Sequence, residues 1–294
     1  MKLSKHIPSI CILLAASLWG LTGLFVRTLN AMGLDNIQLL FIRSAVTASS
    51  LFVYIILTDK NKLRISPKDW WYFFGTGILS FLFFGFFYFY TIAHASMSVA
   101  VILLYTAPFF VMLMSCLFFR EKITISKLIA LLAACSGCLL ICGTDNNVSL
   151  TAIVILTGLG SGFCYALYSI FARVALKKYS SMTVTLYTFL FATLGSLFVV
   201  DFPTIGKLCL ENPTAILIAV AFGFISAFFP YLLYTAGLKN TEPGKASIMA
   251  TLEAVVASFA GIIVFGESLT IAGAIGIILV FSAVWILNRK KSNQ

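Results

Sequence analysis

The stretch that runs from Ala250-Thr-Leu-Glu-Ala254 to Phe265-Gly-Glu-Ser-Leu-Thr270 decides the fold of this chain. It places one acid, Glu253, in the middle of an apolar segment, which then turns sharply into another apolar segment. The same pattern occurs 146 residues earlier, where Phe119-Arg-Glu-Lys-Ile-Thr124 separates two apolar segments. The stretch therefore predicts that the chain contains two copies of one unit, each spanning one half of the sequence.

The offset of 146 residues also relates other parts of the two halves. The corresponding residues are Ser50-Leu-Phe-Val53 with Ser196-Leu-Phe-Val199, Trp19 with Tyr165, Arg27 with Arg173, and Pro108 with Ala254. Because a constant offset over most of each half is hard to obtain by chance, we expect one repeat in residues 1–143 and the other in residues 144–294. The stretch that joins them is short, so both repeats should pack into one compact transmembrane domain.

The composition is typical of a membrane protein. Of the 294 residues, 61% are hydrophobic and 10% are charged, whereas roughly a quarter of the residues in a soluble domain are charged. Apolar segments of about 20 residues, the length that crosses a bilayer as a helix, recur along the chain. We therefore expect an all-α integral membrane protein with ten transmembrane helices. These helices are expected at about residues 8–29, 35–57, 70–91, 97–119, 124–142, 150–172, 181–200, 213–238, 246–265 and 269–287.

The formal net charge of +10 has two possible meanings. It could indicate a nucleic-acid partner, but the basic residues lie in short loops between apolar segments, which is the orientation signal of a membrane protein. If Lys2 and Lys5 are cytoplasmic, 17 of the 20 basic residues lie on the cytoplasmic side, while Arg27 and Lys207 lie outside and Arg43 lies within the second span. We expect a multi-pass protein of the inner (plasma) membrane with both termini in the cytoplasm and no nucleic-acid partner.

Five spans in each repeat have a consequence for topology. Because five is odd, the second repeat enters the membrane from the opposite side, so the two repeats form an inverted pair. Transporters use such pairs to open a central site to either face of the membrane in turn. The alternative is a duplicated membrane scaffold or sensor that transports nothing.

Two charged residues lie well inside the expected spans. Glu253 is near the middle of the ninth span and Arg43 is about a third of the way into the second. Each costs roughly 2.5–3.5 kcal/mol at a helix centre, so neither should face lipid. Glu253 could couple transport to protons or contact a substrate amine, or it could anchor a helix. Arg43 could bind a substrate carboxylate, or it could pair with Glu253 or with helix-end carbonyls.

Aromatic residues mark a second part of the candidate site. Several lie close to the middle of the membrane, on four different spans. They are Trp19, Tyr105, Tyr165, Phe229 and Tyr231. Rings with a polar tip at this depth suit an amphipathic organic solute, although each ring could instead pack against lipid. Together with Glu253 and Arg43, these residues are the candidate substrate-binding residues.

Other polar groups are expected to be structural. Glu121 and Glu267 lie at span-linking turns just before Thr124 and Thr270, whose hydroxyls can cap the helix that follows. Three cysteines at residues 135, 138 and 142 share one helical face and could bind a soft metal, but no histidine or acid accompanies them. We therefore expect packing residues, no metal and no cofactor.

An enzyme that acts within the membrane is a third possibility. Such an enzyme would use Glu253 as a general acid or base. The sequence offers neither a nucleophile constellation nor a set of metal ligands to accompany that acid, so we expect no enzymatic activity.

These features resemble the EamA family of the drug/metabolite transporter superfamily. Three of them carry the resemblance: the two five-span repeats, Leu18-Trp19-Gly20 in the first span, and a turn of the Gly-Glu type after the fourth span of each repeat. The resemblance covers nearly the whole chain. The sequence departs from the family at Leu252-Glu253-Ala254, where Leu-Glu-Pro is frequent, and at Arg120-Glu121, where the family has Gly-Glu.

The resemblance implies a ten-helix inner-membrane carrier with a central cavity lined by spans one, three, four, six, eight and nine. It also implies that Trp19, Tyr105, Tyr165 and Glu253 face this cavity. Family members commonly export amino acids and related metabolites, so we expect an exporter of small amphipathic solutes. The expected partners are this small-molecule substrate and the lipid bilayer, with the protein acting as a monomer or homodimer.

Overall fold

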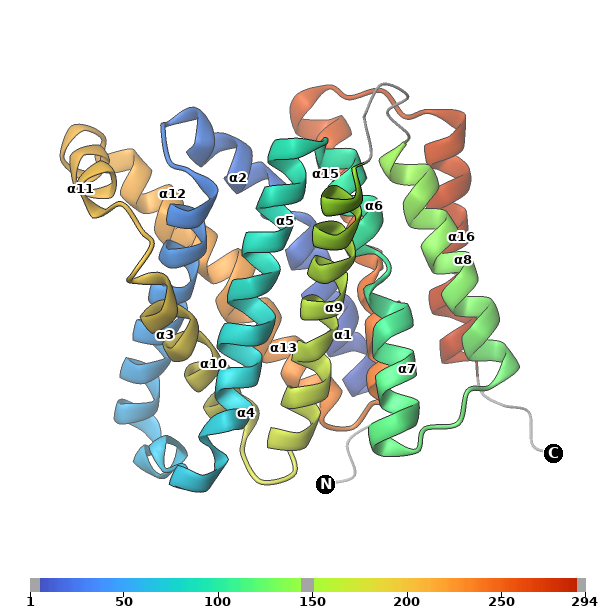
Figure 1. The fold of residues 1–294 in the computed structure, drawn as a ribbon, viewed down its shortest axis with the longest axis horizontal. Helices are drawn as coiled ribbons and strands as arrows, with labels where there is room; N and C mark the ends of the chain where they lie inside the picture. The colour runs from blue at the N-terminus through green and yellow to red at the C-terminus, as the bar shows by residue number, and fades with distance from the viewer. Residues whose placement is uncertain (1–5, 144–150, 290–294) are drawn as a thin grey trace.

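The structure is a computed structural model that describes residues 6–143 and 151–289. These residues form a bundle of helices that run roughly along one common direction, with no strand among them (Figure 1). The expectations for Lys2, Lys5 and residues 290–294, and for the loop at 144–150, lie outside the described residues. The beginning of the first helix and the end of the last helix lie at the same end of the bundle (Figure 1).

The helices are listed here once in chain order. They are α1 (Ile7–Gly20), α2 (Thr22–Ala31), α3 (Asn36–Thr58), η1 (Lys60–Leu63), η2 (Pro67–Asp69), α4 (Trp70–Phe74), η3 (Gly75–Leu82), α5 (Phe83–His94), α6 (Met97–Leu104), α7 (Ala107–Phe119), α8 (Ile125–Cys142), α9 (Ala152–Ala175), α10 (Ser181–Ser196), α11 (Phe202–Glu211), α12 (Pro213–Gly223), η4 (Phe224–Phe228), α13 (Phe229–Leu238), α14 (Pro243–Ala250), α15 (Leu252–Phe265) and α16 (Ile271–Asn288).

Nine helical segments of the described chain are long and apolar enough to cross a membrane. Large apolar side chains cover their outer faces, as illustrated by Ile263 and Ile271, which are 79% and 84% exposed. An apolar surface of this kind is suited to contact with the acyl chains of the lipid bilayer. The expected seventh span corresponds to α10, which has 16 residues and at 1.5 Å per residue falls short of the roughly 30 Å hydrocarbon core. Where we expected an outer loop, the structure has the short helix α11.

The last helices of the two halves have equivalent boundaries. The end of α15 lies 146 residues after the end of α7. In the same way, α16 begins and ends 146 residues after α8. The turn between α7 and α8 lies at the lower end of Figure 1, whereas the turn between α15 and α16 lies at the upper end. We call these the α7–α8 end and the α15–α16 end. Equivalent turns therefore lie at opposite ends of the bundle.

The two turns also have the same backbone geometry. Arg120 and Gly266 both adopt the left-handed conformation, with φ of 55° and 67°. The hydroxyl of Thr124 accepts a hydrogen bond from the Lys127 N–H at 3.3 Å, and that of Thr270 accepts one from the Gly273 N–H at 3.0 Å. These bonds satisfy a backbone donor that would otherwise be free at each helix start. The expected caps are confirmed.

Three spans are broken near their middles. The breaks separate α1 from α2, α6 from α7, and α14 from α15. Two further spans contain π-helical segments, η3 and η4, which end at residues 82 and 228 and so occupy equivalent positions. A π segment adds a residue to a helical turn and changes the face that later side chains occupy.

The break in the ninth span forms without the proline that is frequent in the family. The hydroxyl of Thr251 donates to the Ile248 carbonyl oxygen at 2.7 Å. The N–H of Ala254 bonds to the Thr251 carbonyl at 3.0 Å, three residues back rather than four. This tighter turn separates α14 from α15. Thr106 makes the same two bonds, to the Leu103 carbonyl oxygen and from the Phe109 N–H, at the break of the fourth span, where Pro108 also lies in the first turn of α7.

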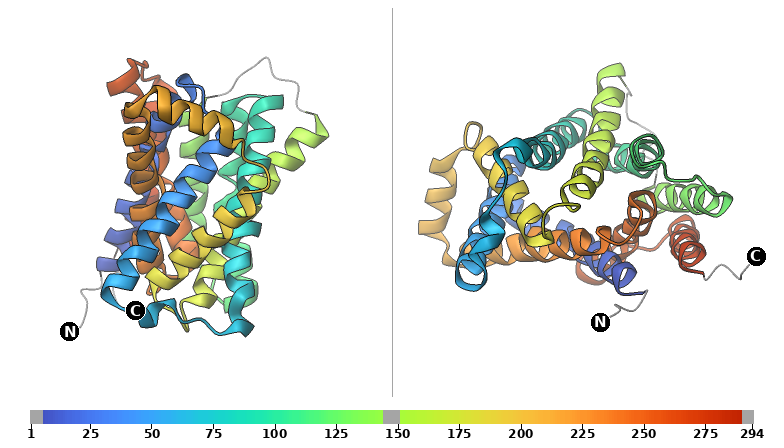
Figure 2. Two further views of the ribbon diagram at one scale, coloured as in Figure 1. Left: turned by 90° about the vertical axis from the view of Figure 1, so that its left-hand side faces the viewer. Right: turned by 90° about the horizontal axis from the view of Figure 1, so that it is seen from below.

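Close contact between glycines joins the last helices of the two halves. A Cβ on Gly137 would stand 2.7 Å from the Gly276 carbonyl oxygen, and one on Gly276 would stand 2.5 Å from that of Gly137. Small residues allow helices to approach closely in lipid. As a result, α8 and α16 pack side by side at one edge of the bundle (Figure 2).

Candidate functional site

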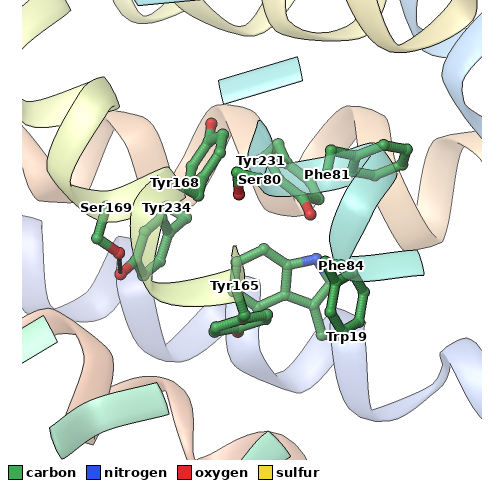
Figure 3. A pocket seen from close by; sticks show the side chains of 9 residues that line it. All are labelled: Trp19, Ser80, Phe81, Phe84, Tyr165, Tyr168, Ser169, Tyr231 and Tyr234. Carbon is green, nitrogen blue, oxygen red and sulfur yellow. Dashed lines mark hydrogen bonds between the residues drawn. The ribbon is translucent and has the colours of Figure 1, made fainter. Parts of the chain in front are cut away.

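A small aromatic cavity lies inside the bundle, where α1, η3, α5, α9 and α13 meet (Figure 3). Its volume is about 10 Å³, close to the minimum that holds one water molecule. The lining residues are Trp19, Ser80, Phe81, Phe84, Tyr165, Tyr168, Ser169, Tyr231 and Tyr234. Three of the expected site residues, Trp19, Tyr165 and Tyr231, therefore share one cavity.

The aromatic rings pack edge to face around this cavity. The ring centroids of Trp19 and Tyr231 are 5.2 Å apart, and those of Tyr168 and Tyr231 are 5.0 Å apart with perpendicular planes. Such arrangements place the positive edge of one ring against the negative face of another. They give the cavity apolar walls.

The hydroxyl groups of the lining tyrosines differ in their bonding. Tyr234 shares a 2.8 Å hydrogen bond with Ser169, and Tyr168 shares a 2.9 Å hydrogen bond with Thr235. The hydroxyls of Tyr165 and Tyr231 make no hydrogen bond to any other group in the described part of the chain. Two polar tips in an otherwise apolar cavity thus remain available to a ligand, which is the usual pattern of a small-molecule site.

Glu253 lies beside the cavity rather than in its wall. It occupies the first turn of α15, directly after the break at Thr251, where the helix dipole favours a negative charge. Tyr105 lies against its carboxyl group and caps the end of α6 at the break in the fourth span. The two broken spans of equivalent position therefore meet at Tyr105 and Glu253.

The backbone of Glu253 is also close to the cavity. Its carbonyl oxygen lies 2.7 Å from the point where a Cβ on Gly20 would stand, and Gly20 directly follows the cavity residue Trp19. Glu253 and the cavity therefore belong to one region, although Tyr105 and Glu253 are not among the residues that line the cavity itself.

Arg43 lies behind the cavity wall. Its guanidinium carbon is 4.5 Å from the centre of the Phe81 ring, a cation–π contact, and its Nε atom is buried with no hydrogen-bond partner in the part of the chain that the structure describes. Among the described residues Arg43 forms no ion pair, so the pairing with Glu253 that we considered does not occur. Phe81 separates Arg43 from the cavity.

Phe229 lies outside the site. Its side chain is 48% exposed and packs against Phe228, with ring centroids 5.0 Å apart. The π segment η4 ends immediately before it, and the extra residue of that segment changes which side chains face inward. Position along a straight helix therefore did not predict that Phe229 faces outward.

Sequence reasoning missed several lining residues. Tyr168 and Tyr234 follow the expected Tyr165 and Tyr231 by three positions on the same helices. Residues three apart share a helix face, so this spacing was a usable signal. Ser80 and Phe81 lie in the π segment η3 and carry no comparable signal.

The cysteines take packing positions. Cys138 is buried and packs in a cluster with Ala254 and Val255. The Cys135 thiol lies 3.5 Å from the Tyr105 carbonyl oxygen. No group of three or more potential metal ligands occurs in residues 6–143 and 151–289.

A second, larger hollow of about 1,040 Å³ opens at the α7–α8 end. Charged residues line it, and Lys127 lies 2.6 Å from Glu242 and 3.7 Å from Glu121. Burial raises the pKa of Glu121, while the positive charge of Lys127 opposes this shift. Both acids at the repeat turns, Glu121 and Glu267, take part in ion pairs.

Comparison with known proteins defines the class of this fold and site. The model of the EamA-like transporter family matches residues 6–143 and, a second time, residues 152–289. The second match begins and ends 146 residues after the first. The chain therefore belongs to the EamA-like transporter family and is a multi-pass membrane transporter.

Relatives of known name agree with this assignment. An "uncharacterized transporter" of Archaeoglobus fulgidus is 29% identical over 96% of this chain and 99% of its own length. The "uncharacterized transporter YxxF" of Bacillus subtilis is 24% identical over 95% of this chain and 89% of its own length. One solved crystal structure has the same fold, with a TM-score of 0.79 at 16% identity over 97% of both chains.

Proposed function

We propose that this transporter is an alternating-access carrier of the inner (plasma) membrane that exports small amphipathic metabolites, such as amino acids or their analogues. The observation that carries this proposal is the aromatic cavity, with two free tyrosine hydroxyls, beside the junction of broken spans at Glu253. Discontinuous helices at the middle of the membrane are typical of substrate and ion sites in carriers.

The relation between the two halves supports alternating access. The helices of the last two spans in each half nearly coincide at an offset of 146 residues, and equivalent turns lie at opposite ends of the bundle (Figure 1). We infer ten spans arranged as two inverted five-helix repeats, residues 1–143 and 144–294, in which α10 is the seventh span. Two near-equivalent halves can exchange conformations and open one site to either side.

The distribution of basic residues supports the orientation. Arg120, Lys127, Arg173 and Lys245 all line the hollow at the α7–α8 end. Cytoplasmic loops carry an excess of lysine and arginine. We therefore assign the α7–α8 end and both termini to the cytoplasm, and we infer that the solute enters from this side.

The cavity must widen to accept a solute. Binding sites for small molecules usually occupy about 300–1,000 Å³, whereas the cavity holds about 10 Å³. Trp19 and Tyr231, which are in ring-to-ring contact across the cavity, are the side chains whose separation would open it. Their spans also contain a break and a π segment, features that mark places where a helix can bend.

Glu253 is the proposed coupling residue. An unpaired carboxylate within the membrane is costly, so the group is neutral, hydrogen-bonded or in contact with water. Loading and release of one proton at Glu253, next to the N-terminal end of α15, would link solute movement to the proton gradient.

Ligand binding to the purified protein tests the proposal. Phenylalanine, tryptophan, threonine, tyramine and uridine would be screened for an increase in the unfolding temperature in detergent, because a ligand that binds the native state stabilises it. At least one amino acid or amine should raise this temperature. Trp19→Ala should abolish the increase, while Phe229→Ala, a change on the exposed face, should retain it. A protein that no compound stabilises would contradict the proposed substrate class.

A further inference from the structure

Two arginine–glutamate pairs occupy equivalent positions in the two halves. Arg27 corresponds to Arg173 and Glu267 corresponds to Glu121, both at the offset of 146 residues. The two acids are held by the same turn: the N–H of Glu121 bonds to the Ser115 carbonyl, and the N–H of Glu267 bonds to that of residue 261, each at 3.3 Å. The backbone therefore presents both carboxylates in the same way at opposite ends of the bundle.

At the α15–α16 end the pair is formed. An Nη atom of Arg27 lies 2.7 Å from a carboxylate oxygen of Glu267. The guanidinium carbon of Arg27 also lies 4.6 Å from the centre of the Phe265 ring. These contacts join α2, the outer part of the broken first span, to the turn between α15 and α16.

At the α7–α8 end the equivalent pair is not formed. Arg173 donates instead to the carbonyl oxygens of Leu238 and Lys239, both at 2.6 Å. Glu121 lies 3.7 Å from Lys127. The large hollow of this end is lined by both Arg173 and Glu121, so the two partners lie on the walls of an open space.

The aromatic residue of the turn shows the same difference. Phe119 is equivalent to Phe265, but its ring lies 5.7 Å from the Lys177 ammonium group instead of beside Arg173. Both contacts that Arg27 makes at one end are therefore exchanged for other partners at the other end.

We propose that Arg27–Glu267 and Arg173–Glu121 are alternating gate pairs of the transport cycle. In the conformation described, the first pair closes the α15–α16 end while the second is separated and the α7–α8 end is hollow. In the opposite conformation Arg173 and Glu121 join, and Arg27 and Glu267 separate. This inference rests on the proposed alternating access, which requires that two equivalent halves exchange conformations.

The energetics suit a gate that must open in every cycle. The side chains of Arg27 and Glu267 are 48% and 47% exposed, and exposed ion pairs stabilise by little. Such a pair biases the equilibrium between two conformations without locking either. At the other end, Lys127 and the two backbone carbonyls satisfy Glu121 and Arg173 while they are apart, so separation leaves no buried charge unpaired.

The two gates are not identical in chemistry. The position equivalent to Lys127 is Gly273, so no matching lysine is available to Glu267 when it leaves Arg27. The carboxylate of Glu267 must therefore be solvated by water when it separates from Arg27. Replacement of Arg27 should therefore change the equilibrium between the two conformations mainly through the lost ion pair. Replacement of Arg173 would also remove its hydrogen bonds to Leu238 and Lys239.

Labelling of a cavity cysteine tests the proposal without any substrate. Ser169 lines the cavity, and Ser169→Cys would be introduced after replacement of the seven native cysteines. An impermeant maleimide would be applied to right-side-out and to inverted membrane vesicles. Arg27→Gln and Glu267→Gln should each increase labelling from the α15–α16 side about two- to fivefold, as expected for loss of an exposed pair, and decrease labelling from the other side.

Matched variants make the result specific. The charge exchange Arg27→Glu with Glu267→Arg should restore the original labelling. Lys207→Gln and Glu211→Gln break an exposed ion pair within α11, at 3.9 Å, and should change nothing. Adding Glu121→Gln to Glu267→Gln should return labelling toward the original value, because it weakens the gate that forms in the opposite conformation.

Two results would overturn the gate. One is labelling in Arg27→Gln and Glu267→Gln that equals that of the α11 controls. The other is a charge exchange that folds, as judged by size-exclusion chromatography, but labels like the single variants. If the single variants fail to fold, Glu267→Asp provides a second test, because it keeps the charge but shortens the side chain. This variant should also increase labelling from the α15–α16 side. Unchanged labelling would overturn the gate proposal. A protein whose labelling responds as expected but that binds no solute would contradict the proposed function and leave the gate in place.

Discussion

The carbonyl oxygen of Glu253 lies 2.7 Å from the point where a Cβ on Gly20 would stand. Gly20 is the last residue of α1, and Glu253 is in the first turn of α15, so the first and ninth spans cross where both are broken. Because the crossing brings a backbone oxygen so close, it requires glycine at position 20. This contact fixes the acid beside the aromatic cavity.

Gly20→Ala should disturb this crossing. The new methyl group would meet the Glu253 carbonyl and the Val256 side chain, whose Cβ would be 2.6 Å away. Overpacking of this kind costs about 1–3 kcal/mol, and thermal unfolding in detergent should show the loss. Gly23→Ala is the control, because no atom lies within 4 Å of that position. Equal stabilities of the two variants would mean that the helices move apart freely at this point.

Replacement of Glu253 separates coupling from anchoring. Glu253→Gln keeps the shape but cannot titrate, so it should fold normally and lose the pH dependence of phenylalanine transport. Glu253→Leu should also lower stability, because its polar neighbours, Tyr105 among them, lose their partner. The measurement is uptake into proteoliposomes at a series of pH values from about 5 to about 8, because the pH dependence of a rate reports the titration of an essential acid or base. A wild type without pH response, matched by the Gln variant, would remove the coupling role.

The free hydroxyls of the cavity should matter for binding and not for folding. Tyr165→Phe and Tyr231→Phe remove groups that have no partner in the described chain, so their unfolding temperatures should match the wild type. Affinity for a ligand that uses these hydroxyls should fall by about fivefold or more, since a hydrogen bond contributes about 1 kcal/mol. Tyr234→Phe breaks the bond to Ser169 and should lower stability instead. Loss of stability in Tyr165→Phe and Tyr231→Phe, with loss of affinity in Tyr234→Phe, would contradict this assignment of structural and ligand-binding hydroxyls.

Stability should depend on pH through Glu121. Burial raises the pKa of this carboxyl above its ordinary value of 4.5. A group of this kind adds stability that is fully present below the unfolded pKa and is lost as pH rises through the folded pKa. The wild type should therefore lose stability relative to Glu121→Gln as pH increases above 4.5. Melting curves of both proteins test this, with Glu211→Gln on the exposed helix α11 as the control. A difference that grows in the opposite direction would contradict the burial argument.

Much of the architecture could be predicted from local sequence patterns. The offset that relates Glu121 to Glu267 also relates their turns, because chain reversal and capping depend on a few neighbouring residues. Long apolar segments predicted nearly all the spans, since length and hydrophobicity decide membrane insertion. The aromatic residues Trp19, Tyr165 and Tyr231, which the sequence marks as candidate site residues, share one cavity in the structure.

Features that depend on tertiary packing could not be predicted in the same way. Position on a regular helix does not reveal a π segment, and this is why Phe229 faces outward. The break at Thr251 forms although position 254 is alanine, because the bonds of the Thr251 turn do not depend on a proline, and a proline pattern does not detect such a turn. Arg43 lies over Phe81 rather than beside Glu253, because helix neighbours, and not depth in the membrane, decide which charges can meet.

Counterflow in proteoliposomes tests the central claim of a carrier most directly. Vesicles loaded with unlabelled phenylalanine would receive a trace of labelled phenylalanine outside, with tyramine and uridine in parallel experiments. A carrier exposes one site to each side in turn, so at least one loaded solute should drive transient accumulation of its own label, and Trp19→Ala should abolish this while Phe229→Ala preserves it. Label that enters no faster in loaded vesicles than in empty ones, for every solute that stabilises the protein, would contradict the account.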